Sequence, residues 1–195
     1  MSKIFIFDLD GTIADGLSEY FLIFQEFTKK YKGVNYSAED FETFKEIGIK
    51  AFIKRANLPL IKPPFLVIEA RKKLSESYSR LKPIRGIADV LIRMKEKGYL
   101  LGIITSNSQK NLKTFLKNNQ LDFFDFTKTG SSLFGKASKL KKIITENKLD
   151  KNNIYYVGDE IRDIEAAKKN RVKSIGVIWG LNSKQALKKP SLISS

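Results

Sequence analysis

Short apolar runs alternate with segments of helical periodicity along most of the chain. Continuous apolar runs of this length are typical of strands that are buried on both faces of a parallel sheet. Such strands are predicted at residues 3–7, 99–105, 154–158 and 174–179, with a weaker one near 123–127. Amphipathic helices are predicted at residues 87–97, 107–118 (beginning after Ser106), 136–148 and 160–169. This alternation predicts a doubly wound α/β fold around a parallel sheet.

Residues 16–82 interrupt the alternation with helical patterns alone. Ser37 and Asp40 have the spacing of a capping box that opens a second helix, and a third helix is predicted around residues 65–81. The first helix carries an apolar stripe formed by Leu17, Tyr20, Phe21, Phe24, Phe27 and Tyr31, and prolines at positions 59, 63 and 64 precede the third. The pattern predicts a core domain made of residues 1–15 and 83–195, with residues 16–82 inserted as an all-α subdomain.

Composition narrows the chemistry that the chain can perform. Its 195 residues are 42% hydrophobic and 29% charged, which suits one globular domain with an insertion, and its apolar runs are too short to cross a membrane. The N-terminus lacks the features of a signal peptide, so a cytoplasmic location is expected. The absence of histidine and cysteine excludes imidazole bases and thiolate metal sites, and leaves carboxylates, lysine and tyrosine as acid–base groups.

The chain is strongly basic, with 36 Lys and Arg against 21 Asp and Glu, which gives a formal net charge of +15. These basic residues are scattered through the sequence and fit the solvated faces of helices, which argues against a dedicated nucleic-acid surface. The positive field would still attract a small anionic substrate.

The stretch Asp8-Leu-Asp-Gly-Thr follows the first predicted strand directly. Ligands of an open parallel sheet bind beyond the carboxyl ends of its strands, and residues i and i+2 of an extended segment face the same way. Asp8 and Asp10 are therefore expected to approach one reacting centre or one Mg²⁺ ion, which prefers oxygen ligands. Gly11 lets the backbone turn close to an anion. The structural alternative is a simple Asp/Gly turn that closes the strand.

Four stretches together resemble the signatures of the haloacid dehalogenase superfamily, in the same order. The first is Asp8-Leu-Asp-Gly-Thr. The others are Thr105 at the end of an apolar strand, Lys136 in Gly-Lys-Ala-Ser-Lys, and the pair Asp159 and Asp163 in Gly-Asp-Glu-Ile-Arg-Asp. Taken singly, the later stretches have plainer interpretations as a helix cap, a surface lysine and acids that offset a helix dipole. The insertion at 16–82 resembles the small α-helical cap of phosphoglycolate-phosphatase-like members.

This resemblance implies a role for each residue in phosphoryl transfer. Asp8 is the expected nucleophile and forms an aspartyl-phosphate, and Asp10 is the expected general acid and base. Mg²⁺ is expected on the Asp8 carboxylate, the Asp10 backbone carbonyl and Asp159, with Glu160 as an alternative ligand. Binding of the phosphoryl group is expected from Thr105, Ser106, Asn107 and Lys136, and Asp163 is expected to orient Lys136 or a metal-bound water.

The expected activity is hydrolysis of a small phosphate monoester such as phosphoglycolate, a sugar phosphate or a nucleotide. Asp10 favours a phosphatase over a hydrolytic dehalogenase, which lacks that second carboxylate. A phosphomutase of the same superfamily and a non-catalytic basic protein that binds nucleic acid or an acidic partner are the alternatives. The cap is expected to open and close about residues 14–16 and 82–86, where Arg85 replaces a proline common in the family. The expected oligomeric state is a monomer or a homodimer.

Overall fold

The computed structural model describes residues 2–37, 39–41, 43, 55, 68–69, 72–73, 75–130, 135–182, 184 and 187. Within this part of the chain, five parallel strands form one sheet in the order β3-β2-β1-β4-β5. The strands are β1 (Ile4–Phe7), β2 (Leu100–Ile104), β3 (Phe126–Lys128), β4 (Ile154–Gly158) and β5 (Lys173–Gly176). The chain runs outward from β1 through β2 to β3 and then returns to the other side of β1, where β4 and β5 follow. The predicted doubly wound fold is therefore confirmed. The order of strands reverses between β1 and β4.

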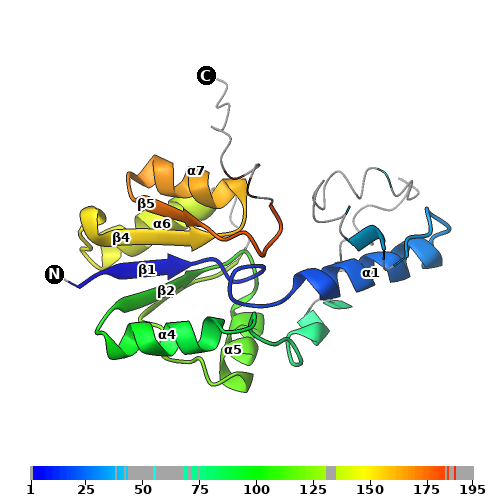
Figure 1. The fold of residues 1–195 in the computed structure, drawn as a ribbon, viewed down its shortest axis with the longest axis horizontal. Helices are drawn as coiled ribbons and strands as arrows, with labels where there is room; N and C mark the ends of the chain where they lie inside the picture. Colours follow the sequence, from blue (N-terminus) through cyan, green and yellow to red (C-terminus); the bar gives the residue numbers. More distant parts are fainter. Residues whose placement is uncertain are drawn as a thin grey trace.

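Helices cover both faces of the sheet, and the alternation of side chains along β1 decides which residues each face receives. The helices are α4 (Ile87–Glu96), α5 (Gln109–Asn118), α6 (Gly135–Glu146) and α7 (Ile161–Asn170), with a 3-10 turn at Lys151–Asn153. Phe7 packs with Leu91 of α4 and Phe115 of α5, whereas Ile6 packs with Leu140 of α6 on the opposite face. Figure 1 shows α4 and α6 on opposite sides of the strands. Ile6 and Phe7 are both buried, as expected for a strand covered on both faces, whereas β5 is exposed along its length.

The start of α5 differs from the prediction by two residues. The helix begins at Gln109, and its N-cap is Ser108, whose side chain accepts a hydrogen bond of 3.1 Å from the Asn111 amide. The amide of Asn107 instead donates to Thr105 Oγ1 at 3.0 Å, within the turn that precedes the helix. The expectation that the amides of Ser106 and Asn107 open the helix was therefore wrong, because a second serine further along the chain provides the cap.

The insertion begins with helix α1 (Leu17–Lys30), which extends away from the sheet in Figure 1. Leu17, Phe21, Phe24 and Phe27 are buried along its predicted stripe. Asp40 accepts from the Ser37 amide at 2.7 Å, as the capping box predicted. The Ser37 side chain accepts from the Glu39 amide at 3.2 Å, one residue before the expected donor. The three prolines and residues 65–67 lie outside the described residues.

The two connections between insertion and sheet lie side by side. Ala14 pairs with Pro83 in an antiparallel bridge, the Asp15 amide donates to the Lys82 carbonyl at 2.9 Å, and the Ile84 amide donates to the Ile13 carbonyl at 2.8 Å. These residues coincide with the expected hinges, although the domain boundaries themselves stay a prediction. Arg85 is exposed immediately after this pairing.

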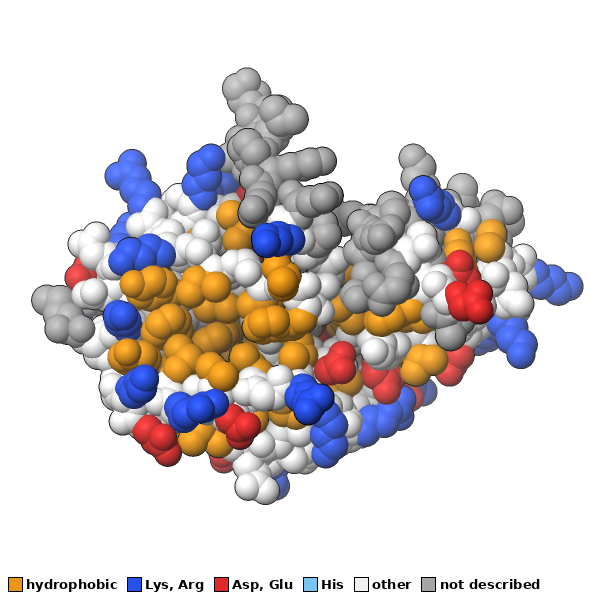
Figure 2. Space-filling model, in the orientation of Figure 1, with side chains coloured by type: hydrophobic (Ala, Val, Ile, Leu, Met, Phe, Trp, Pro, Cys, Tyr) orange, Lys and Arg blue, Asp and Glu red, His pale blue; other side chains and the backbone are white. Residues whose placement is uncertain are grey.

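The surface in Figure 2 carries apolar side chains over the sheet and basic side chains spread around them. Phe5 of β1 stacks on Tyr155 of β4 with ring centroids 5.0 Å apart and lies 5.5 Å from the ring of Tyr99. Lys and Arg residues alternate with acidic ones on this view, which agrees with the scattered charge of the sequence. None of the helices in the described part of the chain has the length and hydropathy that a bilayer crossing requires.

Candidate active site

Asp8 lies at the carboxyl end of β1, where the order of strands reverses. Its amide donates to the Val157 carbonyl of β4 at 2.8 Å, and the residue is only 2% exposed. The chain then turns sharply, since the amides of Ile13 and Ala14 both donate back to the Leu9 carbonyl. The turn brings Asp8 and Asp10 to the edge of the sheet at which an open α/β fold binds its ligands.

Gly11 is required by this turn for two reasons. Its φ is +78°, which is a conformation that favours glycine. A Cβ at this position would also collide with the carboxylate of Asp159, which follows β4. The glycine therefore allows the β1 turn and the acidic group after β4 to approach each other closely.

Lys136, in the first turn of α6, lies among the acidic side chains. Its Nζ is 3.0 Å from Asp8 Oδ2, 2.5 Å from Asp163 Oδ1 and 3.8 Å from Glu160 Oε1, and its side chain is 4% exposed. Burial acts to lower the pKa of Lys136, but the charges of Asp8 and Asp163 outweigh it and raise the pKa above its usual value. The lysine therefore stays protonated and places a fixed positive charge beside the candidate nucleophile.

Asp163 fixes the position of that lysine. One of its carboxylate oxygens accepts from Lys136 Nζ, and the other accepts from the Glu160 amide at 3.0 Å as part of the capping box of α7. The residue is fully buried at 0% exposure. Because both oxygens already have donors, the geometry suits a supporting group for Lys136.

Asp159 lies on the other side of the turn after β1. Its Oδ1 accepts from Thr12 Oγ1 at 3.0 Å, and its Oδ2 accepts from the Leu181 amide at 2.7 Å. Burial raises the pKa of Asp159 to about 6. Thr12 had no predicted role beyond its place in the first signature, because its contact with Asp159 joins residues 147 positions apart.

The Asp10 carboxylate is held by side chains from two parts of the molecule. Its Oδ2 accepts from Asn107 Nδ2 at 2.8 Å and lies 3.5 Å from Thr105 Oγ1, while its Oδ1 accepts from the hydroxyl of Tyr78. Tyr78 belongs to the inserted segment and is 1% exposed. The sequence missed Tyr78, since an isolated tyrosine among the helical residues of an insertion carries no signature.

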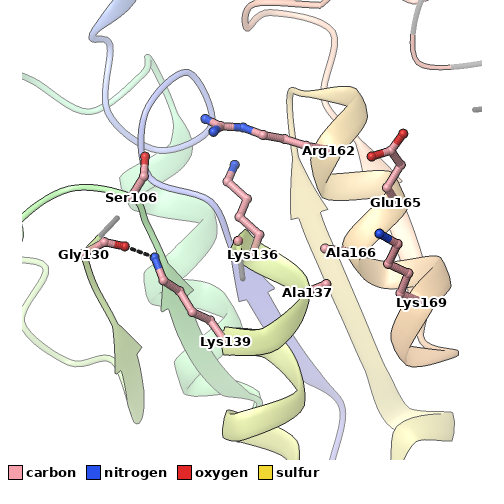
Figure 3. Close-up of a pocket in the computed structure, with 10 residues that line it drawn as sticks. Ser106, Gly130, Lys136, Ala137, Lys139, Arg162, Glu165, Ala166 and Lys169 are labelled. Atoms are coloured by element: carbon pink, nitrogen blue, oxygen red, sulfur yellow. Dashed lines mark hydrogen bonds between the residues drawn. The ribbon is translucent and has the colours of Figure 1, made fainter. Parts of the chain in front are cut away.

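A basic recess adjoins Lys136 on the side of α6 and α7 (Figure 3). It has a volume of about 290 Å³, and its lining includes Ser106, Lys136, Lys139 and Arg162. The ammonium of Lys139 donates to the carbonyls of Thr105 and Gly130, which ties α6 to the loops that follow β2 and β3. In Figure 3 the side chains of Ser106, Lys136 and Arg162 extend toward the same end of the recess. Positive charge in this place suits a phosphoryl group.

The acidic groups also fit a divalent cation. Carboxylate oxygens of Asp8, Glu160 and Asp163 lie within 4.8 Å of one another around the Lys136 ammonium, which already occupies Asp163. Asp8 also has the buried carboxylate of Asp159 near it, against the turn that follows β1. Burial raises the pKa of Asp8 despite the opposing charge of Lys136, and the neighbouring carboxylates of Asp163, Asp10 and Asp159 raise it further. Carboxylate oxygens are the ligands that Mg²⁺ prefers.

Several known proteins are similar to this chain over most of its length. A phosphoglycolate phosphatase of Synechococcus elongatus is 27% identical over 93% of this chain and 86% of its own length. A phosphoglycolate phosphatase of Aquifex aeolicus is 24% identical over 91% of this chain and 85% of its own length. A solved haloacid dehalogenase-like family hydrolase from Streptococcus pneumoniae superposes with a TM-score of 0.78 at 21% identity, covering 95% of this chain and 89% of its own.

The family assignment follows from the match over nearly the whole chain. The model of the family described as haloacid dehalogenase-like hydrolase matches residues 5–177, which include each of the four signatures and the insertion between the first two. The chain belongs to the haloacid dehalogenase-like hydrolase family, and it is a hydrolase.

Proposed function

We propose that the chain is a Mg²⁺-dependent phosphatase that hydrolyses a small phosphate monoester through an aspartyl-phosphate on Asp8. One observation carries the proposal: two carboxylates lie two residues apart at the edge of the sheet but have different surroundings. Asp8 is buried beside the Lys136 ammonium, whereas Asp10 is partly buried among hydroxyl and amide groups. Such a difference suits one carboxylate to act as nucleophile and the other to transfer protons.

In the first step, a carboxylate oxygen of Asp8 attacks phosphorus, and the bond from phosphorus to the ester oxygen breaks. Asp10 gives its proton to that leaving oxygen. In the second step, Asp10 takes a proton from a water molecule that attacks phosphorus, and the bond between Asp8 and phosphorus breaks to release inorganic phosphate. Asp10 ends protonated and Asp8 ionised, so the enzyme is restored.

The remaining polar groups would bind the transferring phosphoryl group and the metal. Thr105, Ser106, Asn107 and Lys136 supply hydroxyl, amide and ammonium donors. Mg²⁺ would be held by the carboxylates of Asp8 and Asp159 and the backbone carbonyl of Asp10, with Glu160 as an alternative ligand. When bound, the ion supplies positive charge that offsets the repulsion between a carboxylate and a phosphate dianion.

Phosphoglycolate is the first substrate to test, because the curated relatives described above carry that name. Sugar phosphates and nucleotides complete the panel, since the net charge of +15 favours small anions in general. A phosphomutase would use the same aspartyl-phosphate and pass it to a sugar hydroxyl, so conversion between isomers of a sugar phosphate would identify it. A cytoplasmic location and a monomeric or homodimeric state stay predictions.

The test measures release of inorganic phosphate from this panel with Mg²⁺ and with EDTA, for the wild type, Asp8→Asn and Asp89→Asn. Asp89 is an exposed acid in the first turn of α4, so its substitution controls for the loss of one negative charge. Release that requires Mg²⁺, is abolished in Asp8→Asn and persists in Asp89→Asn would support the proposal. Release that continues in EDTA or in Asp8→Asn would contradict it.

A further inference from the structure

A chain of hydrogen bonds links the inserted segment to Asp10 through the core domain. Ser75 Oγ donates to Asn111 Oδ1 at 2.7 Å, and Asn111 Nδ2 donates to Asn107 Oδ1 at 2.9 Å. Asn107 Nδ2 then reaches both Asp10 Oδ2, at 2.8 Å, and the hydroxyl of Tyr78. The chain thus starts at Ser75 in the insertion, crosses the first turn of α5, and returns to the insertion at Tyr78.

Tyr78 closes this network on the carboxylate itself. Its hydroxyl donates to Asp10 Oδ1, and the charge of Asp10 also acts on the nearby phenol of Tyr20 in α1. Burial and then the charge of Asp10 raise the pKa of both phenols, so both keep their protons. The ring of Tyr78 packs in the main apolar core with Leu81 and Ile13, which fixes the direction in which its hydroxyl points.

We propose that Tyr78 is a positioning residue through which the inserted segment orients Asp10 for proton transfer to the leaving group. Asn107 holds one oxygen of the carboxylate from the core, and Tyr78 holds the other from the insertion, so the carboxylate is fixed only when both parts of the chain are together. Separation of residues 75–78 from α5 would release Asp10 from Tyr78. The inference rests on the proposed function and adds that proton transfer depends on contact with the insertion.

The consequence is a defect that varies with the leaving group. Hydrolysis of an alkyl phosphate expels an alkoxide, which needs a proton from Asp10 as the bond to phosphorus breaks. The 4-nitrophenolate ion is stable without that proton, so the phosphorylation of Asp8 by 4-nitrophenyl phosphate depends far less on Asp10. A residue that only stabilises the fold would affect the two esters equally.

The experiment compares kcat/KM for ethyl phosphate and 4-nitrophenyl phosphate, because this ratio reports steps up to the release of the leaving group. Tyr78→Phe keeps the ring and removes the hydroxyl. We expect it to lower kcat/KM for ethyl phosphate by about 10-fold to 100-fold, which is the size expected from a misplaced catalytic group. The value for 4-nitrophenyl phosphate should fall by less than about 2-fold. Tyr31→Phe removes another hydroxyl of the insertion, which bonds Glu69 at 2.9 Å and is not part of the network around Asp10, so it should change neither value.

A second variant keeps the test decisive if Tyr78→Phe does not fold. Asn107→Ala removes the donor to the other oxygen of Asp10 and should shift the ratio of the two kcat/KM values in the same direction. An unchanged ratio in a folded variant would overturn the inference, as would a rise in activity, which would mean that Tyr78 holds Asp10 away from the leaving group.

The Asp8→Asn variant separates failure of this inference from failure of the proposed function. If Asp8→Asn is inactive and the ratio in Tyr78→Phe equals that of the wild type, the phosphatase proposal stands and the role of Tyr78 is refuted. If Asp8→Asn still cleaves both esters, the proposed function fails and the role of Tyr78 fails with it.

Discussion

Substitution of Lys136 by methionine provides the sharpest test of the electrostatics of the site. Methionine retains most of the volume of the buried stem but removes the ammonium that contacts Asp8 and Asp163 at 3.0 Å and 2.5 Å. Loss of one partner leaves these two carboxylates buried without the neighbouring cation, and breaking a buried ion pair in this way typically costs about 3–5 kcal/mol. For a chain of this size, that corresponds to a Tm lower by roughly 6–20 °C.

The loss should depend on pH, and its sign follows from the pKa directions. Burial raises the folded-state pKa of Asp8 and Asp163 above the unfolded value, and Lys136 opposes that rise. Without Lys136, the pKa values of the Asp8 and Asp163 carboxyls in the folded state rise further above their unfolded values. Protonation of these carboxyls therefore stabilises the folded state at low pH, and this stability is lost as the pH rises through their folded-state pKa values. The free energy of unfolding of Lys136→Met should therefore fall further below that of the wild type at mildly alkaline pH than at mildly acidic pH.

Urea unfolding in EDTA at both pH values measures this difference, with Lys139→Met as the matched control. Lys139 is also buried in α6, but its ammonium donates to the carbonyls of Thr105 and Gly130, which do not titrate. Its loss should cost about 1–3 kcal/mol, the penalty for unsatisfied buried acceptors, with little change between the two pH values. Equal costs at both pH values in Lys136→Met, or a cost below about 1 kcal/mol, would refute the reasoning.

Two further outcomes are expected. Burial raises the pKa of Asp159 to about 6, and a metal ion binds the ionised carboxylate. Mg²⁺ affinity measured by calorimetry should therefore weaken about tenfold for each pH unit below about 6. An affinity that does not change with pH would argue against Asp159 as a ligand. Gly11→Ala and Gly98→Ala both place alanine at positive φ, +78° and +73°, but only the first directs a Cβ against Asp159. Thermal unfolding should show Gly11→Ala less stable than Gly98→Ala by about 1–3 kcal/mol, and equal costs would contradict the predicted collision.

The fold was predictable because the two periodicities of the sequence are local and strong. The apolar run at residues 154–158 coincides with β4 (Ile154–Gly158), and the helix predicted at 87–97 differs from α4 by one residue at its end. The predicted start of a helix was wrong where two nearby residues offered the same capping chemistry. The start of α5 moved because both Ser106 and Ser108 are able to cap a helix, and packing of the turn after β2 decides between them.

The candidate site was predictable as a set of residues but not as a set of contacts. Asp8, Lys136 and Asp163 were identified through their signatures, and the structure places the Lys136 ammonium within hydrogen-bond distance of both carboxylates. Tyr78 and Thr12 acquired their contacts with Asp10 and Asp159 only through folding. Such contacts join residues distant in the chain, so periodicity and spacing carry no information about them.

The sequence by itself therefore determined the parallel sheet and the acidic residues that follow its strands, because each depends on the order of residues within one segment. Tertiary structure alone decided which carboxylate faces which donor. Lys136 contacts Asp8 and Asp163 because α6 and α7 pack against the same face of the sheet, and Tyr78 reaches Asp10 because the connections at Ala14 and Pro83 run side by side. Electrostatic surroundings depend on distances across the folded chain, and those distances exist only once the layers have packed.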